Sequence, residues 1–163
     1  MIIQEYSNGY VEQVIDLILG IQQKELHVQI TAADQPDLRS IKEFYQKGNG
    51  NFWIAVDDRH VVGTIALIDI GDSEVALRKM FVHPDYRGKF NATAQGLMDK
   101  VFEWSTNRQL KNIYLGTIDI MKAAHRFYEK NGFIVIDRDR LPLSFPVMQV
   151  DNIFYRFSFS GST

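Results

Sequence analysis

The chain has 163 residues, of which 45% are hydrophobic and 23% are charged, and its formal net charge is −2 at pH 7. Such a composition is typical of one globular domain over residues 1–163, and the slightly negative charge excludes a basic surface field that would attract nucleic acid. The absence of cysteine excludes disulfides and thiol nucleophiles. No apolar run is long enough to span a membrane and no signal-peptide pattern begins the chain, so we expect a cytoplasmic protein without membrane contact.

The first part of the chain predicts a short strand and two helices. Residues 1–6 are β-prone, whereas residues 10–23 carry apolar side chains at helical spacing. Residues 24–33 show a mixed pattern and are expected to form a loop. A second helix is expected to begin at Pro36 and to stop at the Gly-Asn-Gly of residues 48–50.

Three strands are expected next as an antiparallel meander. Residues 51–57 and 61–70 are β-prone and are separated by a tight polar turn, which indicates a hairpin. The third strand covers residues 74–82, after a second turn at residues 71–73. Pro84 closes this strand.

The second half of the chain alternates helices with strands. We expect helices at about 94–106 and 120–130, strands at 112–116, 133–136 and 153–158, and a long loop at 137–151. A strand followed by a helix and another strand should form a right-handed parallel crossover. The pattern as a whole predicts one three-layer α/β domain with helices on both faces of the sheet.

A polar loop with two cations lies between the third strand of the meander and the next helix. Arg87 and Lys89 flank Gly88. The first turn of a helix has unpaired N–H groups and the positive end of the helix dipole, so a loop that opens onto it can bind an anion. We interpret the loop as a pyrophosphate site, although an ordinary surface loop is the commoner explanation of an Arg-Gly-Lys alone. The candidate contacts are Arg87, Gly88, Lys89, Phe90, Asn91, Ala92 and Thr93.

Two segments resemble the motifs of the GNAT superfamily of acetyl-CoA-dependent N-acetyltransferases. In residues 82–92, a strand ends in Val-x-Pro and leads to a loop similar to the family's Arg/Gln-x-x-Gly-x-Gly/Ala. This loop departs from the family at Phe90, where glycine is usual. Residues 124–133 resemble Ala-x-x-Leu/Phe-Tyr-Glu-Lys-x-Gly-Phe at every position, although Met121 stands where the family often has asparagine. The resemblance implies that the anion is the pyrophosphate of acetyl-CoA.

The resemblance also implies details of the fold. It predicts a single GNAT-like domain whose mixed, mostly antiparallel sheet has a central pair of parallel strands that splay apart. Strand 74–82 would separate from strand 112–116 and leave a V-shaped slot. Met80, Phe81 and Val82 would then pair with the extended pantetheine arm, as an added strand does, and supply an N–H group to the oxyanion of the tetrahedral intermediate.

Tyr128 is the candidate catalytic acid. In the family, the tyrosine of the second motif lies near the thioester sulfur, where a departing thiolate needs a proton. A phenol with a pKa of about 10 can donate one without being ionised at neutral pH. Without the resemblance, a helix tyrosine packed under the sheet would be the simpler explanation.

The base that deprotonates the amine is less well defined. Many family members place a glutamate on the strand that corresponds to residues 74–82, and alignment puts Ala76 at that place. Glu74 lies two residues earlier on the same face and is the candidate catalytic base. His83, Asp119 and a water relay are alternatives. The four histidines show no metal-ligand spacing, so we expect no metal site.

The sequence therefore predicts an N-acetyltransferase that moves an acetyl group from acetyl-CoA directly to a primary amine of a small molecule. Direct transfer needs no cysteine. A non-catalytic acyl-CoA-binding sensor, a protein N-terminal acetyltransferase and a nucleotide-phosphate binder of another class are the alternatives. The acceptor is not determined by the sequence, and the last strand with its preceding loop could form a homodimer.

Overall fold

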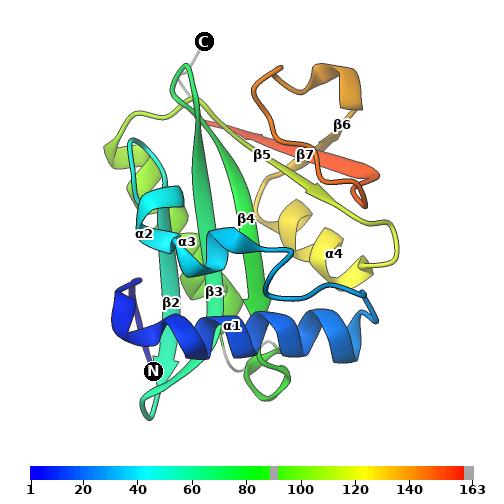
Figure 1. Ribbon diagram of the computed structural model, residues 1–163. Coiled ribbons are helices and arrows are strands. Elements are labelled where there is room, and N and C mark those ends of the chain that lie inside the picture. The colour runs from blue at the N-terminus through cyan, green and yellow to red at the C-terminus, as the bar shows by residue number, and fades with distance from the viewer. Residues whose placement is uncertain (89–91, 160–163) are drawn as a thin grey trace.

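The computed structural model describes residues 1–88 and 92–159 and shows a seven-stranded mixed sheet in the order β1-β2-β3-β4-β5-β7-β6 (Figure 1). The strands are β1 (Ile2–Glu5), β2 (Asn51–Asp57), β3 (His60–Gly71), β4 (Glu74–Val82), β5 (Asn112–Thr117), β6 (Ile134–Ile136) and β7 (Ile153–Ser158). The α-helices are α1 (Val11–Gly20), α2 (Ile41–Phe44), α3 (Thr93–Asn107) and α4 (Lys122–Lys130). Among the strand pairs described, β4 and β5 are parallel and the others antiparallel.

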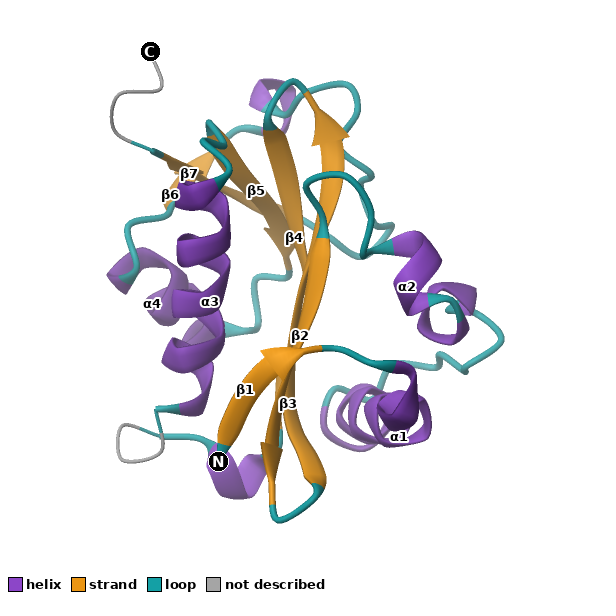
Figure 2. Ribbon diagram, turned by 90° about the vertical axis from the view of Figure 1, so that its left-hand side faces the viewer, coloured by secondary structure: helices purple, strands orange, loops and turns teal. Residues whose placement is uncertain are grey.

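Helices cover both faces of the sheet, as the sequence predicted. Figure 2 shows α3 and α4 on one face and α1 and α2 on the other. Leu97 and Met98 of α3 are fully buried in one core cluster, and Val14 and Ile18 of α1 are fully buried in the other. Because the central strands are covered on both sides, they are apolar at consecutive positions rather than alternate ones. None of the helices in the described residues is long and apolar enough to cross a membrane.

Most predicted elements are confirmed within a residue or two, and the helices before β2 differ most. The first helix continues as a π-helical turn, Ile21–Glu25, beyond its predicted end. The second predicted helix is split into a 3-10 turn, Pro36–Arg39, and the single turn of α2, because Ser40 between them leaves helical geometry (φ −138°, ψ 41°). The buried residues Leu38 and Ile41 lie in different turns but keep helical spacing, so the pattern did not reveal the break.

The central parallel strands splay apart, which confirms the predicted slot. Pairing between β4 and β5 is confined to residues 74–76 of β4 and 112–114 of β5. Beyond it, β4 remains paired with β3 and β5 remains paired with β7. We refer to the open space between residues 77–82 and 115–117 as the gap. Figure 1 shows the two strands separating toward their carboxyl ends, with α4 beside the opening.

A β-bulge interrupts β4 where the gap begins. Thr64 of β3 pairs with Phe81, whereas Ala66 pairs with Arg78, so two residues of β4 oppose one residue of β3. Lys79 in the bulge has a φ of +53°, a left-handed conformation that is uncommon outside glycine. Bulges often re-aim side chains next to functional sites. Here the bulge directs two consecutive side chains to the same face of the sheet. Arg78 bonds the Pro146 carbonyl of the β6–β7 loop, and Lys79 bonds Gln35 of the α1–α2 segment.

Candidate functional site

The predicted anion-binding loop joins β4 to α3. Gly88 (φ +96°) and Ala92 (φ +53°) are both left-handed, so the chain turns sharply at either end of the loop. Ala92 caps the N-terminus of α3, whose first turn contains no acidic residue. This arrangement suits an anion, because the positive end of the helix dipole meets no nearby carboxylate from its own first turn. Predicted contacts from residues 89–91 (Lys89, Phe90 and Asn91) lie outside the described residues.

Arg87 and Thr93 lie at the two ends of this loop and make different contacts. The Arg87 guanidinium donates through Nη1 and Nη2 to the Glu25 carboxylate, at 2.7 Å and 3.0 Å, and through Nε to the Val82 carbonyl at 2.8 Å. It therefore links the end of β4 to the π-helical turn after α1. The Thr93 side chain is buried, with its Oγ1 3.5 Å from the Met1 sulfur.

The edge of β4 that faces the gap can bind an extended ligand. The His83 amide donates to the Val62 carbonyl of the β3 side at 2.8 Å. Because successive amides of a strand point to opposite edges, the Val82 amide faces the gap and the Phe81 amide faces β3. The Phe81 side chain packs against the α1-side core, and the Met80 side chain packs against the α3-side core. Val82 is thus the predicted strand residue best placed to bond a ligand.

Tyr128 of α4 is held rigidly by other aromatic rings. Its side chain is 6% exposed, and its ring centroid lies 5.8 Å from that of Phe133 and 5.9 Å from that of Tyr155. Its hydroxyl makes no hydrogen bond with any residue that the structure describes. Burial, with smaller contributions from Tyr155 and Asp151, raises the pKa of Tyr128 well above its ordinary value of 10. The phenol is therefore fully protonated at neutral pH and has a proton to give.

The three predicted candidates for the base lie in different places. Glu74 is at the paired end of the parallel strands, where its Oε2 accepts hydrogen bonds from Asn112 Nδ2 at 2.8 Å and from the Tyr114 hydroxyl at 3.1 Å. His83 follows β4 at the opposite end, and its Nδ1 accepts from the Asp85 amide at 3.1 Å. Asp119 follows β5 and is exposed. The structure does not bring these three groups together, and their roles stay predictions.

Asp151 is a carboxylate that the sequence reasoning did not identify. It precedes β7, and its side chain lies so close over Gly116 of β5 that a Cβ at Gly116 would collide with the carboxylate. The Met148 amide donates to Asp151 Oδ2 at 3.3 Å. Burial raises the pKa of Asp151, and the positive charge of Arg78 partly opposes this effect. An isolated glycine within a strand often marks such a close approach, so Gly116 was the available signal.

A protein-family model described as the acetyltransferase (GNAT) family matches residues 18–133, which include the splayed strand β4, the predicted anion-binding loop and Tyr128. The chain belongs to the GNAT family of acetyltransferases. Acetyl-CoA is the co-substrate of GNAT enzymes, and the gap between β4 and β5 is the place in this GNAT fold where an extended thioester ligand can lie against an open strand edge.

Several relatives are similar to this chain over much of its length. It is 39% identical over 106 residues to N-acetylaspartate synthetase from Xenopus tropicalis, an alignment that covers 64% of this chain and 38% of that protein. A crystal structure of a GNAT acetyltransferase from Staphylococcus aureus Mu50 matches with a TM-score of 0.91 and 41% identity, covering 96% of this chain and 98% of that one. An acetyltransferase from Streptococcus agalactiae 2603 matches with a TM-score of 0.91 and 34% identity, covering 97% and 98%. The chain thus spans about two fifths of the curated relative's length.

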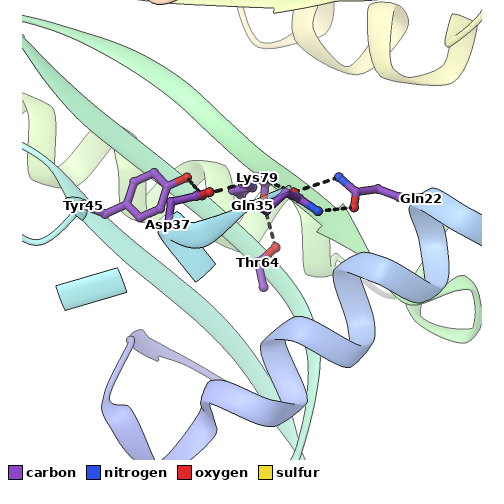
Figure 3. Close-up of polar contacts among 6 residues, drawn as sticks. All are labelled: Gln22, Gln35, Asp37, Tyr45, Thr64 and Lys79. Atoms are coloured by element: carbon purple, nitrogen blue, oxygen red, sulfur yellow. Dashed lines mark hydrogen bonds and ion pairs between the residues drawn. The ribbon is translucent and has the colours of Figure 1, made fainter. Parts of the chain in front are cut away.

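A buried polar network attaches the α1–α2 segment of this GNAT domain to the bulge of β4 (Figure 3). Lys79 Nζ lies 2.5 Å from Gln35 Oε1 and 3.7 Å from Asp37 Oδ2. The Tyr45 hydroxyl donates to Asp37 at 2.5 Å, and the Gln22 and Gln35 amides bond each other. Burial lowers the pKa of Lys79 more than Asp37 raises it. The network fixes the α1–α2 segment to the bulge of β4, where the gap begins.

Histidine and carboxylate side chains form no metal centre in the described part of the chain, since no three of them converge there. The buried His125, for example, lies with its Nε2 2.8 Å from the Ile118 carbonyl, which fixes the turn before α4.

Proposed function

We propose that the protein transfers an acetyl group from acetyl-CoA directly to a primary amine of a small molecule. The observation that carries this proposal is the gap between β4 and β5, with the predicted anion-binding loop after β4 and with α4, which carries Tyr128, beside the opening (Figure 1). The family supports the reaction class. The name of the relative N-acetylaspartate synthetase supports a small amino compound as the acceptor.

The co-substrate is expected to lie along β4. Its pyrophosphate would bind the loop from Arg87 to Thr93, with Arg87 supplying charge and the first amides of α3 supplying donors. Its pantetheine arm would pair with the free edge of β4 at Val82, and the thioester would then reach the part of the gap near Tyr128. An N–H group of Met80 to Val82 would stabilise the oxyanion.

The reaction needs two proton movements besides the attack of nitrogen on carbon. The neutral amine attacks the thioester carbonyl, the carbon–sulfur bond of the tetrahedral adduct breaks, and the thiolate of coenzyme A departs. Tyr128 is expected to donate its proton to that thiolate. It then recovers a proton from the nitrogen, so that the amide and the free thiol are the products and the phenol is restored.

A non-catalytic acyl-CoA sensor is the second candidate function. The observation that favours it is Ala76, a fully buried residue at the place where many GNAT members carry a glutamate. The two functions differ in thiol release, so we would measure free coenzyme A across a panel of amines that includes amino acids, polyamines and peptide N-termini. Binding of acetyl-CoA with no release on any amine would establish the sensor and overturn the proposed enzyme.

Replacing Arg87 by alanine should weaken acetyl-CoA binding about 10- to 100-fold, because charged hydrogen bonds are worth roughly 1.5–3 kcal/mol. Isothermal titration calorimetry would measure this. Glu25→Gln is the matched control, since it removes the ion pair with Arg87 but keeps the guanidinium. We expect this variant to bind acetyl-CoA at least as tightly as the wild type. Equal weakening in both variants would show that Arg87 only supports the loop, and no binding by the folded wild type would overturn the proposed function.

A further inference from the structure

Arg78 carries a largely buried charge that forms no ion pair among the described residues. Its guanidinium lies 5.6 Å above the Phe145 ring and donates through Nη2 to the Pro146 carbonyl. Its Nε is buried without a hydrogen-bond partner, and Arg78 takes part in none of the ion pairs found among residues 1–88 and 92–159. Its neighbour Lys79, by contrast, is paired with Asp37.

A buried guanidinium N–H group without a hydrogen-bond acceptor destabilises the fold, and a bound ligand that supplies an acceptor removes this cost. Guanidinium groups stay charged in proteins and present their donors in a planar fork that matches a carboxylate. A carboxylate ligand would satisfy several donors at once with short, charge-assisted hydrogen bonds. The environment of Arg78 therefore suits a carboxylate-bearing ligand better than a cationic one such as a polyamine.

Asp151 presents the opposite charge from the other side of the gap. Arg78 belongs to β4 and bonds the Pro146 carbonyl, whereas the Asp151 carboxylate lies over Gly116 of β5 and accepts from the Met148 amide. Because Pro146 and Met148 are two residues apart, their Cα atoms are at most about 7 Å from each other. The two charged groups thus share one short loop, yet they form no ion pair. A zwitterionic ligand would therefore pair with both groups, its anion with Arg78 and its cation with Asp151.

We propose that the acceptor is an amino acid whose α-carboxylate binds Arg78 and whose amino group lies at Asp151, which removes a proton from it. This assignment rests on the proposed acetyl transfer and names its substrate class. An α-amino acid carries its ammonium and its carboxylate on the same carbon, and Asp151 and Arg78 offer an anion and a cation to these two groups. The Asp151 charge also helps to raise the pKa of Tyr128, so the two groups interact electrostatically.

The protons balance with this assignment. The ammonium loses one proton to the Asp151 carboxylate, and the resulting amine attacks the thioester carbonyl. The departing thiolate takes the Tyr128 proton, and the nitrogen of the adduct returns one to Tyr128. Asp151 then releases its proton to water. One ammonium and one thioester thus give one amide, one thiol and one proton.

Other charged groups on this face are less suited to bind the carboxylate. Arg156 of β7 also has a buried Nε without a hydrogen-bond partner, but its side chain interacts with the Tyr114 hydroxyl. Tyr114 in turn donates to Glu74 at the paired end of the strands, away from the gap. Arg138 lies 6.0 Å above the Phe154 ring in the β6–β7 loop. It is the matched control for Arg78, because it is an arginine of the same loop region that also lies over a phenylalanine ring.

The acceptor test compares free amino acids with their α-carboxamides, which keep the amine and lose the negative charge. Aspartate, glutamate and alanine would be used, with spermidine as a cationic amine. We expect the wild type to prefer each free acid about 10- to 100-fold in kcat/KM. Arg78→Gln should abolish this preference by raising the acceptor KM while the acetyl-CoA KM is unchanged. Arg138→Gln should keep the preference.

Asp151→Asn tests the second half of the assignment. It should lower kcat with the free acid about 100-fold, as loss of a general base does. It should also remove the loss of kcat/KM at acidic pH, because that loss reports protonation of Asp151. The charged and titratable groups that interact with Asp151 are Arg78 of β4 and Tyr128 of α4. Asp139→Asn, an exposed carboxylate of the same loop, should change neither quantity.

Thermal unfolding shows whether Asp151→Asn acts through stability. The pKa of Asp151 is raised above 3.8 in the fold, so the contribution of Asp151 to stability is present below that pH and is lost as pH rises through the raised folded pKa. At neutral pH the asparagine variant should therefore unfold no earlier than the wild type. A lower kcat with an unchanged or higher Tm supports a role at the reacting amine.

Two results would overturn the assignment while leaving acetyl transfer intact. One is acetylation of carboxamides or spermidine at least as efficiently as free acids, and the other is an Arg78→Gln variant that keeps the preference for free acids. Asp151→Asn with wild-type kcat would remove Asp151 from the mechanism. Absence of acetyl-CoA binding to the wild type would instead overturn the proposed function, and this assignment with it.

Discussion

Replacing Tyr128 by phenylalanine is expected to lower kcat about 100-fold or more, because a positioned general acid contributes roughly 10²- to 10⁴-fold. The change removes only a hydroxyl that bonds none of the described residues, and the remaining ring keeps its contacts with Phe133 and Tyr155. Acetyl-CoA affinity should therefore change little. Steady-state kinetics with a saturating acceptor, together with calorimetric binding of acetyl-CoA, would measure the two effects separately.

The pH dependence of the wild type gives a second measure of the same role. Burial raises the pKa of Tyr128, so the protonated phenol persists above pH 10 and the alkaline loss of kcat should lie beyond that of a free tyrosine. Tyr155→Phe is the matched control, since it removes a neighbouring hydroxyl that donates to Glu129 at 2.7 Å. Equal losses in the two variants, or wild-type kcat in Tyr128→Phe, would contradict the assignment of Tyr128 as the acid.

Local patterns along the chain were sufficient to predict the order of elements and the class of fold. Apolar residues at helical spacing predicted α1, α3 and α4, and the turn at Asp58 and Arg59 has the left-handed geometry that the hairpin required. The end of α4 at Lys130 was also predicted correctly, and the left-handed Gly132 follows it. These features depend on neighbours within a few residues, which is the range over which a single sequence is informative.

The arrangement of charges at the gap depends on contacts between distant segments and could not be predicted in this way. Alternation along β4 would place Arg78 and Lys79 on opposite faces, and only the bulge brings them to the same one. Asp151 reaches Gly116 because β7 pairs antiparallel with β5, whose residues lie far earlier in the chain. Glu74 was a reasonable candidate from its position in the strand, but its distance from the gap depends on where β4 and β5 stop pairing.

The buried pair of Lys79 and Asp37 should have the largest effect on stability. Lys79→Met approximately keeps the length of the side chain but removes the charge, so Asp37 and Gln35 each lose one of their donors. Breaking a buried ion pair by removing one partner typically destabilises a protein by 3–5 kcal/mol. We expect a loss of about 3 kcal/mol, which corresponds to a fall in Tm of roughly 6–12 °C for a domain of this size. Thermal and chemical unfolding would measure it, with the exposed Lys42→Met as control.

A double-mutant cycle distinguishes the ion pair from simple packing. The pKa of Lys79 is lowered because burial disfavours its charge more than Asp37 favours it, so the pair as a whole is not strongly stabilising. Asp37→Asn retains an acceptor for the Tyr45 hydroxyl, which now lies 2.5 Å from Asp37 Oδ2. Combining it with Lys79→Met removes both charges, and the double variant should regain most of the stability that either single change loses. If the losses are simply additive, Lys79 holds the α1–α2 segment by its aliphatic contacts rather than by its charge.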